Sequence, residues 1–409
     1  MKYLLVIGDG MADDPIEKFG GKTPLQYAKT PTMDRLASAG VLGTVLTVPE
    51  GMPPGSDTAI LSIFGCDPRI FYGGRAPLEA AASGIKVATG DVAYRCNMVS
   101  FEDGDMDFED RKIISHSAGS VDGELADMLI EELFELPEFK EMATKAKMIV
   151  YPGTSFRHIV VQKTPNIKGL KLIPPHDHLG EALGHNLPSG CDNAVVLKTL
   201  IKLAYEFLND HPANIARRAE GNLPANGIWF WAEGESVELP DFSKKYGMTG
   251  GVVSEVPLCQ GIAILIGLKK ILVEGATGEL DTNYEGMVDV ALELLETCDF
   301  VAIHIEAPDE CTHNGDTEGK LQAIEWIDSR VLAPLIERLE GAGEDFRMLF
   351  MSDHKTLTSS RGHDGSPVPF IIYDSGIDNK TGLKYCEDDA MHGGFLDDGT
   401  KLMGMLFDG

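Results

Sequence analysis

Basic residues are scarce in this chain. Its 409 residues include 35 Lys and Arg against 64 Asp and Glu, which gives a formal net charge of −29. Binding to nucleic acid requires a basic surface for the phosphate backbone, so this composition argues against nucleic acid as the main partner. If the substrate is an anion, a few Arg and Lys side chains must converge locally against the overall field, and each basic residue becomes more informative.

Paired cysteines and long apolar runs are also absent. The seven cysteines are scattered and never form Cys-x-x-Cys, which predicts reduced thiols in a cytoplasmic protein. The first apolar run, MKYLLVIG, stops at Gly8-Asp9 and does not resemble a signal peptide. The other long run, GIAILIGLKKILV, contains two lysines and is too short to span a membrane. We therefore expect a soluble protein that does not contact a membrane.

Strand-like runs alternate with helical segments at both ends of the chain, which predicts an α/β domain with a largely parallel sheet. The strands are expected at 3–7, 300–306, 347–353 and 368–374, and the helices at 32–39, 57–64, 283–297 and 317–340. The middle differs: VAYRCNMVSF alternates like an antiparallel strand with one solvent-exposed face, and acidic helices are expected at 121–146 and 192–209. We predict that residues 1–75 and 225–409 form the α/β domain and that 76–224 form a smaller, inserted α+β domain.

Polar residues follow three of the predicted buried strands. Because parallel strands present their carboxyl ends at one edge of a sheet, where ligands bind, these residues should meet. Three carboxylates and three histidines are too many for one metal ion and suit two, and oxygen and nitrogen ligands favour manganese, zinc or magnesium. The residues are Asp9, Asp309, His313, Asp353, His354 and His363.

Other residues near these strands have less specific interpretations. Asp309 and His313 are expected in a loop, and Cys311 between them is interpreted as a loop thiol. His304 and His158 lie inside apolar runs and are interpreted as core histidines.

Ser56, in the segment GMPPGSDTAILS, has two interpretations. Its hydroxyl could cap the helix that follows, since Ser accepts hydrogen bonds from the free N–H groups of a first helical turn. It could instead be a nucleophile activated by a divalent ion, placed where a helix N-terminus favours an anion. No Gly-x-x-x-x-Gly-Lys-Ser/Thr loop is present and no Gly-x-Gly-x-x-Gly follows a strand, so a nucleotide-dependent reaction lacks its usual phosphate-binding loop.

Motifs along the whole chain resemble the cofactor-independent phosphoglycerate mutases, in their shorter archaeal-type branch within the alkaline phosphatase superfamily. The matching segments are VIGDGMAD, PPGSDTA, YGGRAPLEAAASGI, NLPAN, GATGELDTNYEGM, APDECTHNGD, SDHKT and HDGSPVPF. The resemblance implies an α/β/α sandwich like that of alkaline phosphatase, with the inserted domain binding the substrate. It also implies conversion of 3-phosphoglycerate to 2-phosphoglycerate through a phosphorylated serine, in glycolysis or gluconeogenesis.

The resemblance further implies two divalent metal ions and no 2,3-bisphosphoglycerate. Manganese is preferred, with zinc and magnesium as alternatives. One ion would be held by Asp9, Ser56, Asp353 and His354, and the other by Asp309, His313 and His363, while Ser56 would carry the phosphate.

Basic side chains are expected to bind the phosphate and carboxylate of the substrate, with Arg suited to bidentate contacts. The candidates are Arg217, Arg218, Arg157, Arg95 and Lys245, joined by His116, His176 and Asp177. Two other functions stay open: phosphate transfer to another small hydroxy compound such as homoserine, proposed for some bacterial members of the branch, and simple metal-dependent phosphatase activity. We expect a monomer or a small homo-oligomer.

Overall fold

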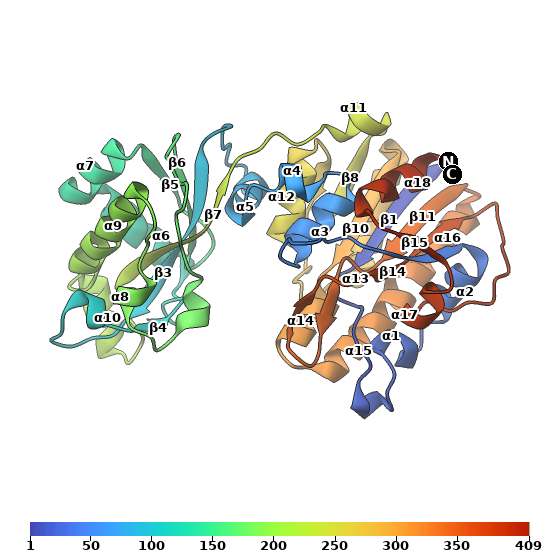
Figure 1. Ribbon diagram of the computed structural model, residues 1–409, viewed down its shortest axis with the longest axis horizontal. Helices are drawn as coiled ribbons and strands as arrows, with labels where there is room; N and C mark the ends of the chain where they lie inside the picture. Colours follow the sequence, from blue (N-terminus) through green and yellow to red (C-terminus); the bar gives the residue numbers. More distant parts are fainter. Residues whose placement is uncertain (409) are drawn as a thin grey trace. The chain divides into compact units, whose positions relative to one another are not determined.

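The computed structural model describes residues 1–408, which form two compact units (Figure 1). Unit 1 combines Met1–Tyr72 with the chain from Glu238 onward, and unit 2 is Gly73–Val237. In the described residues, no helix is both long enough and apolar enough to cross a membrane.

Unit 1 is built on an eight-stranded sheet with strand order β15-β2-β14-β11-β1-β10-β8-β9. The central strand β1 pairs in parallel with β10 and β11, whereas β14 runs antiparallel to β11. Residues 4–7 of β1 are fully buried, as expected for a continuous apolar strand covered on both faces. The strands are β1 (Lys2–Gly8), β2 (Val41–Val45), β8 (Gly250–Val253), β9 (Lys269–Ile271), β10 (Phe300–Ile305), β11 (Phe346–Met351), β14 (Val368–Asp374) and β15 (Gly394–Leu396).

Two groups of helices cover this sheet (Figure 1). One group contains α3 (Ser56–Ile63), α12 (Pro257–Leu265) and α18 (Leu402–Asp408), and the other contains α2 (Pro31–Ala39), α13 (Tyr284–Thr297) and α16 (Ala333–Ala342). The helix predicted at 317–340 forms as α15 (Thr317–Trp326), a wider π-helical segment (Ile327–Leu332) and α16. Shorter elements complete the unit: α1 (Pro24–Tyr27), α4 (Pro68–Phe71), α11 (Phe242–Tyr246), α14 (Ala307–His313), α17 (Glu387–Ala390), β12 (Lys355–Leu357) and β13 (Gly362–Asp364).

Unit 2 is an α+β unit, so the predicted fold class, an α/β sandwich with an additional α+β part, is confirmed. Its long strand β3 (Val92–Phe101) pairs antiparallel with β6 and β7 on its two sides and with β4 near its end. The remaining strands are β4 (Ile113–Ser115), β5 (Met148–Tyr151), β6 (Arg157–Gln162) and β7 (Gly227–Glu235). The helices are α5 (Arg75–Ala82), α6 (Gly123–Glu135), α7 (Pro137–Lys145), α8 (Leu183–Asn186), α9 (Asp192–Leu208) and α10 (Pro212–Ala219).

The prediction that β3 has a solvent-exposed face is wrong. Tyr94 and Cys96 face the main core of unit 2, while Ala93 on the other face packs against Ala76 and Ala80 of α5. Since a helix covers each face, nearly every residue of the strand is buried. Loose alternation of residue types therefore marked a central strand here, not a half-exposed one.

The boundary predicted at residue 224 differs from the structure. β7 follows that position and pairs with β3 along most of its length, which keeps it in unit 2. At the start of the same unit, the Glu235 N–H donates to the Gly73 carbonyl over 2.9 Å, so the first residue of unit 2 lies beside the end of β7.

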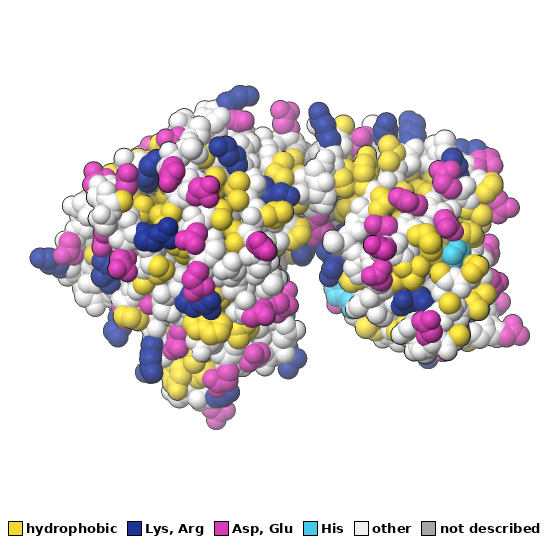
Figure 2. Space-filling model, turned by 180° about the vertical axis from the view of Figure 1, so that it is seen from behind, with side chains coloured by type: hydrophobic (Ala, Val, Ile, Leu, Met, Phe, Trp, Pro, Cys, Tyr) yellow, Lys and Arg dark blue, Asp and Glu magenta, His cyan; other side chains and the backbone are white. Residues whose placement is uncertain are grey.

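The surface charge agrees with the acidic composition. On the face shown in Figure 2, Lys and Arg side chains lie singly among Asp and Glu side chains and form no continuous basic surface.

Candidate active site

Three neighbouring strands of unit 1 deliver the candidate ligands to one edge of the sheet. Asp9 directly follows β1, Asp309 lies on α14 after β10, and Asp353 follows β11. His354 is the next residue, and β13 brings His363 back by pairing with β12. These residues are far apart in sequence, and the parallel register of the three strands brings them together.

Ser56 is the first residue of α3, and the N-cap position before it is occupied by Gly55, which has no side chain to cap the helix. Ser56 Oγ lies 3.1 Å from Asp9 Oδ2 and 3.1 Å from His354 Nε2. The capping interpretation is therefore wrong, because the hydroxyl points at the strand-end residues. Asp353 lies in the same group, with its Oδ2 3.3 Å from His354 Nε2.

A second group adjoins the first. Asp309 Oδ2 lies 3.0 Å from His313 Nε2, and the Nε2 atoms of His313 and His363 are 3.0 Å apart. Asp309 and His313 lie on the short helix α14 rather than in the predicted loop, and their i, i+4 spacing places both side chains on one helix face. The rings of His354 and His363 have centroids 4.4 Å apart and connect the two groups.

The donor atoms fit divalent metal ions. His313 Nδ1 lies 2.8 Å from the Arg361 carbonyl, which can only accept, so Nδ1 carries the proton and Nε2 faces the group. Asp9 Oδ1 and Asp353 Oδ2 are buried without a hydrogen-bond partner within residues 1–408. Three sets of side chains have ligand atoms within 4.8 Å of one another: Asp309, His313 and His363; Asp9, Asp309 and His354; and Asp9, His304 and Glu306.

Gly10 is required by the close packing of this edge. It has φ +60°, and a Cβ on it would lie 2.4 Å from Thr356 Oγ1 and 2.7 Å from Asp309 Oδ1. Thr356 uses the same Oγ1 to donate to Asp309 Oδ1 over 2.5 Å. Thr356 is not among the predicted site residues, although it stands two residues after His354 in the SDHKT motif.

Burial, hydrogen bonds and neighbouring charges shift the pKa values of the site. Burial, reinforced by the Asp353 and Asp309 carboxylates, raises the pKa of Asp9 well above its usual range. Burial also raises the pKa of Asp309, but hydrogen bonds from His313 and His363 outweigh it and hold that pKa well below normal. The hydrogen bond with Asp309 raises the pKa of His313 to about 9. The protein without metal therefore holds protons that a divalent cation would displace.

His304 was interpreted as a core histidine, and the structure gives it a place beside the site. It is fully buried on β10, and its Nε2 lies 2.9 Å from Asp9 Oδ2. It pairs in register with Ile7, two residues before Asp9. In the sequence, the only sign of a role for His304 is that it is a polar residue in an otherwise apolar strand. That sign does not reveal how β10 pairs with β1, which is what places His304 beside Asp9. His158, the other histidine interpreted as a core residue, is buried in β6 of unit 2 and accepts from the Gly153 N–H over 3.2 Å.

Unit 2 contains a group of cationic and aromatic side chains, which we call the arginine–histidine cluster. The Arg95 guanidinium lies 4.5 Å above the Trp231 ring, and the His176 ring lies 5.1 Å from the same ring. Glu79 binds two arginines, with Arg75 Nε at 2.8 Å and Arg95 Nε at 2.7 Å. The cluster consists of Arg75, Glu79, Arg95, His116, Arg157, His176 and Trp231.

The two remaining members of this cluster, His116 and Arg157, come from two other segments. The His116 ring lies 5.9 Å from both the His176 and Phe156 rings, and Arg157 lies over Phe156 at 4.3 Å. Burial lowers the pKa of His116, and His176 and Arg157 lower it further, so this imidazole is neutral at neutral pH. Asp177 lies at the edge, 3.7 Å from His176.

Two of the basic residues predicted to bind the substrate, Arg217 and Arg218, have partners outside this cluster. Arg217 donates to the carbonyls of Leu223 and Ala118, at 2.8 and 3.0 Å. Arg218 makes a bidentate ion pair with Asp103, at 2.9 and 2.7 Å. These contacts join α10 to residues 103, 118 and 223 of unit 2, and none involves the arginine–histidine cluster.

Lys245 of unit 1 donates to the Gly65 carbonyl over 2.5 Å, just beyond the end of α3. At a rise of 1.5 Å per residue, this contact is roughly 13 Å along the helix from Ser56. Substrate contact by Arg217, Arg218 or Lys245 remains a prediction.

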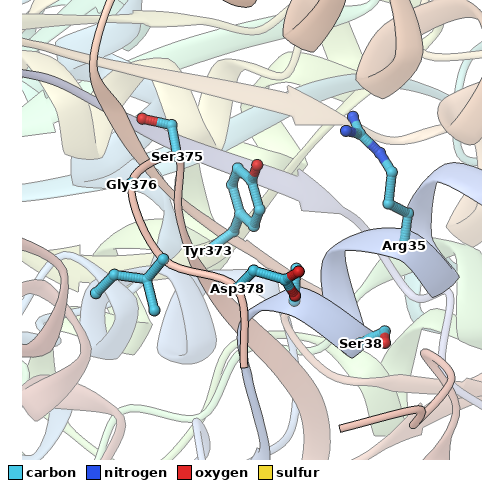
Figure 3. Close-up of a pocket in the computed structure, with 8 residues that line it drawn as sticks. Arg35, Ser38, Tyr373, Ser375, Gly376 and Asp378 are labelled. Atoms are coloured by element: carbon cyan, nitrogen blue, oxygen red, sulfur yellow. The ribbon is translucent and has the colours of Figure 1, made fainter. Parts of the chain in front are cut away.

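A separate hollow of about 420 Å³ lies at the opposite edge of the unit 1 sheet (Figure 3). It is lined by Arg35 and Ser38 of α2 and by Tyr373 and the loop after β14. Asp374, which stands between the lining residues Tyr373 and Ser375, pairs with Arg347 at the beginning of β11. The hollow is therefore at the other end of β11 from Asp353. It is not part of the candidate site.

The fold and the site together define a class of enzyme. Two adjoining carboxylate–histidine groups beside a helix-start serine, at the carboxyl edge of an α/β sheet, form the arrangement of a metal-dependent enzyme of phosphoryl transfer.

Comparisons with known proteins identify the family within this class. A family model described as 2,3-bisphosphoglycerate-independent phosphoglycerate mutase matches residues 37–214. A protein of that name from Methanothrix thermoacetophila is 44% identical, with each chain covered over its full length, and one from Methanosarcina acetivorans is 43% identical over 99% of both chains. The chain belongs to the 2,3-bisphosphoglycerate-independent phosphoglycerate mutase family.

Solved structures agree on the fold. The PH0037 protein from Pyrococcus horikoshii is 29% identical and superimposes with a TM-score of 0.79, covering 100% of this chain and 96% of that one. A cofactor-independent phosphoglycerate mutase from Thermoplasma acidophilum, 24% identical, has a TM-score of 0.63 with both chains fully covered.

Proposed function

We propose that this protein interconverts 3-phosphoglycerate and 2-phosphoglycerate through a phosphoserine at Ser56. The observation that supports this most directly is the position of Ser56 Oγ, 3.1 Å from both Asp9 Oδ2 and His354 Nε2 at the start of α3. Family membership supports the same substrate, since full-length relatives carry the name of this activity.

We propose two divalent ions, preferably manganese, with zinc or magnesium as alternatives. Asp9, Ser56, Asp353 and His354 would hold one, and Asp309, His313 and His363 the other. When bound, the ions would stabilise the negative charge on the serine and on the phosphoryl group. No 2,3-bisphosphoglycerate is needed, because Ser56 itself holds the phosphate between the two transfers.

In the first transfer, Ser56 Oγ forms a bond to phosphorus as the bond between phosphorus and the 3-oxygen breaks. The Ser56 proton passes to Asp9 Oδ2, 3.1 Å away, and solvent gives a proton to the released 3-oxygen. In the second transfer the 2-hydroxyl oxygen attacks phosphorus and loses its proton to solvent, while the bond between phosphorus and Ser56 Oγ breaks and Oγ takes back the proton from Asp9. The N-terminal turn of α3 favours the phosphate through its unpaired N–H groups.

For unit 2 we propose substrate binding by the arginine–histidine cluster. Arg95 and Arg157 are suited to a carboxylate or phosphate, and neutral His116 and His176 can donate or accept hydrogen bonds to glycerate hydroxyls. Arg217, Arg218, Lys245 and Asp177 are weaker members of this proposal, since three of them are engaged in the local contacts described above. The cytoplasm as location and a monomer or small homo-oligomer also remain predictions.

The test uses purified full-length protein supplied with Mn²⁺. Incubation with ³²P-labelled 3-phosphoglycerate and rapid acid quenching should yield phosphoserine at Ser56 and the 2-isomer as product. Ser56→Ala should lose at least a thousandfold in turnover, whereas Ser62→Ala on the same helix should retain activity. Release of free phosphate without the 2-isomer would identify a phosphatase, and Ser56-dependent phosphorylation of homoserine by ATP would identify a kinase; either result would overturn the proposal.

A further inference from the structure

His304 connects two parts of unit 1 through buried hydrogen bonds. It is fully buried on β10, with Nε2 2.9 Å from Asp9 Oδ2 on one side and Nδ1 3.2 Å from Ser254 Oγ on the other. Glu306 is a second possible acceptor for Nε2, but its Oε2 is 3.9 Å away, which is beyond hydrogen-bond distance. Asp9 is therefore the hydrogen-bond partner of this nitrogen.

The surrounding donors assign the protons of this imidazole. Ser254 Oγ already accepts from the Val256 N–H over 3.1 Å, so its own proton is available for His304 Nδ1. Cys259 also lies against this hydroxyl, and burial raises the pKa of its thiol, so the thiol stays protonated and is a weaker acceptor than the imidazole nitrogen. His304 consequently accepts at Nδ1 and carries its proton on Nε2, which donates to Asp9 Oδ2.

The oxygen that receives this proton is the one beside the proposed nucleophile. Asp9 Oδ2 lies 3.1 Å from Ser56 Oγ, while Oδ1 of the same carboxylate has no hydrogen-bond partner in residues 1–408 and lies 3.5 Å from His354 Nε2. A donor fixed on Oδ2 stops the carboxylate from rotating, so each oxygen keeps its own direction. Such contacts orient metal ligands in other proteins.

We infer that His304 is a positioning residue, which acts through Asp9 to hold the carboxylate toward Ser56 in one orientation and which depends on Ser254 for its tautomer. This inference rests on the proposed function in that Ser56 is taken as the nucleophile. Its effect on Asp9 also concerns metal binding, which can be measured without any substrate.

The variants separate hydrogen bonding from packing. His304→Leu removes the donor, His304→Gln restores an N–H donor near the position of Nε2, and Ser254→Ala removes the group that fixes the tautomer. Ile303→Val is the matched control, since it changes buried packing on the same strand and leaves the hydrogen bonds intact. Mn²⁺ affinity is measured by electron paramagnetic resonance, and the rate of Ser56 phosphorylation by quenched single-turnover reactions with labelled 3-phosphoglycerate.

We expect His304→Leu to weaken Mn²⁺ binding and to slow Ser56 phosphorylation, each by about ten- to a hundredfold. His304→Gln should recover a large part of both losses, and Ile303→Val should resemble the unchanged protein. The inference is overturned if His304→Leu behaves like Ile303→Val, or if His304→Gln is as defective as His304→Leu.

A spectroscopic measurement of the His304 tautomer tests the inference even if His304→Leu does not fold. In ¹⁵N-histidine-labelled protein loaded with diamagnetic Mg²⁺, so that Asp9 is ionised, the imidazole shifts of His304 should report the Nε2–H tautomer, and Ser254→Ala should abolish that preference. An Nδ1–H tautomer in the unchanged protein would refute the inference. If instead no 2-phosphoglycerate forms while the tautomer and the Mn²⁺ results hold, the proposed function fails and the role of His304 stands.

Discussion

Lys320 offers a sharp test of how this fold supports its site. It lies on α15, its side chain is fully buried, and its Nζ lies 2.8 Å from Asp13 Oδ2 and 2.6 Å from the carbonyl oxygen of Thr356. Asp13 is also buried, and Thr356 is the residue that donates to Asp309. Replacing Lys320 by Met keeps most of the side-chain volume and removes only the charge and its donors.

The expected loss of stability follows from the Asp13 carboxylate, which stays buried after its charged partner is removed. Removing one partner of a buried ion pair typically costs about 3–5 kcal/mol, because the other charge stays buried without compensation. Asp13 keeps two donors from Thr358, the N–H at 3.1 Å and Oγ1 at 2.6 Å, so the lower end applies. We expect Lys320→Met to lower the free energy of unfolding by about 3 kcal/mol, and the double variant with Asp13→Asn to lose less.

The assay is urea unfolding of the metal-free protein, combined with hydrogen exchange read by mass spectrometry. Peptides from unit 1 should lose protection, while those from unit 2 serve as an internal reference. Lys18→Met is the matched control, because Lys18 pairs at 2.6 Å with Glu318 of α15 and both side chains are more than half exposed, at 57% and 64%. Exposed pairs contribute about 1 kcal/mol or less. If Lys320→Met costs no more than Lys18→Met, the reasoning about buried charge is wrong.

Three further results are expected. Glu79→Gln should raise KM for phosphoglycerate about tenfold with a smaller change in kcat, because Arg95 loses its ion pair; steady-state kinetics that show only a kcat loss would contradict this. Mn²⁺ affinity, measured by calorimetry, should rise by up to about tenfold per pH unit between roughly pH 7 and 9, since His313 must release a proton to ligate and its pKa is about 9; equal affinities at both ends would contradict it. Gly10→Ala should weaken Mn²⁺ binding at least about tenfold, because its Cβ would displace the Asp309 carboxylate, and an unchanged affinity would show that the edge can relax.

Much of unit 1 could be predicted from the sequence, and the reason is periodicity. The runs that became β1, β10, β11 and β14 are mostly apolar and of strand length. A polar residue that follows such a buried parallel strand is placed at the carboxyl edge of the sheet. Asp9, Asp309 and Asp353 were found in this way. The structure adds that His313 follows Asp309 by one helical turn.

The residues that were missed depend on pairing that no local pattern contains. His304 sits beside Asp9 because β10 pairs with β1 in one register, and a shift of one residue would turn its side chain to the other face. Lys320 and Thr356 meet across elements remote in sequence. The domain boundary predicted at residue 224 differs from the structure for the same reason. The aromatic run of β7 is typical of a strand, but it does not show which sheet that strand joins.

The contact between Gly73 and Glu235 bears on how such a protein can arise and be rebuilt. The chain enters and leaves unit 2 at nearly the same point, where the Glu235 N–H meets the Gly73 carbonyl. An insertion with adjacent ends costs its host little loop-closure entropy, whatever its length. Unit 2 is therefore organised as a replaceable insertion: residues 73–237 contain their own hydrophobic core, and their two ends are adjacent. An insertion of this kind can be exchanged without altering the strands that carry the candidate metal ligands.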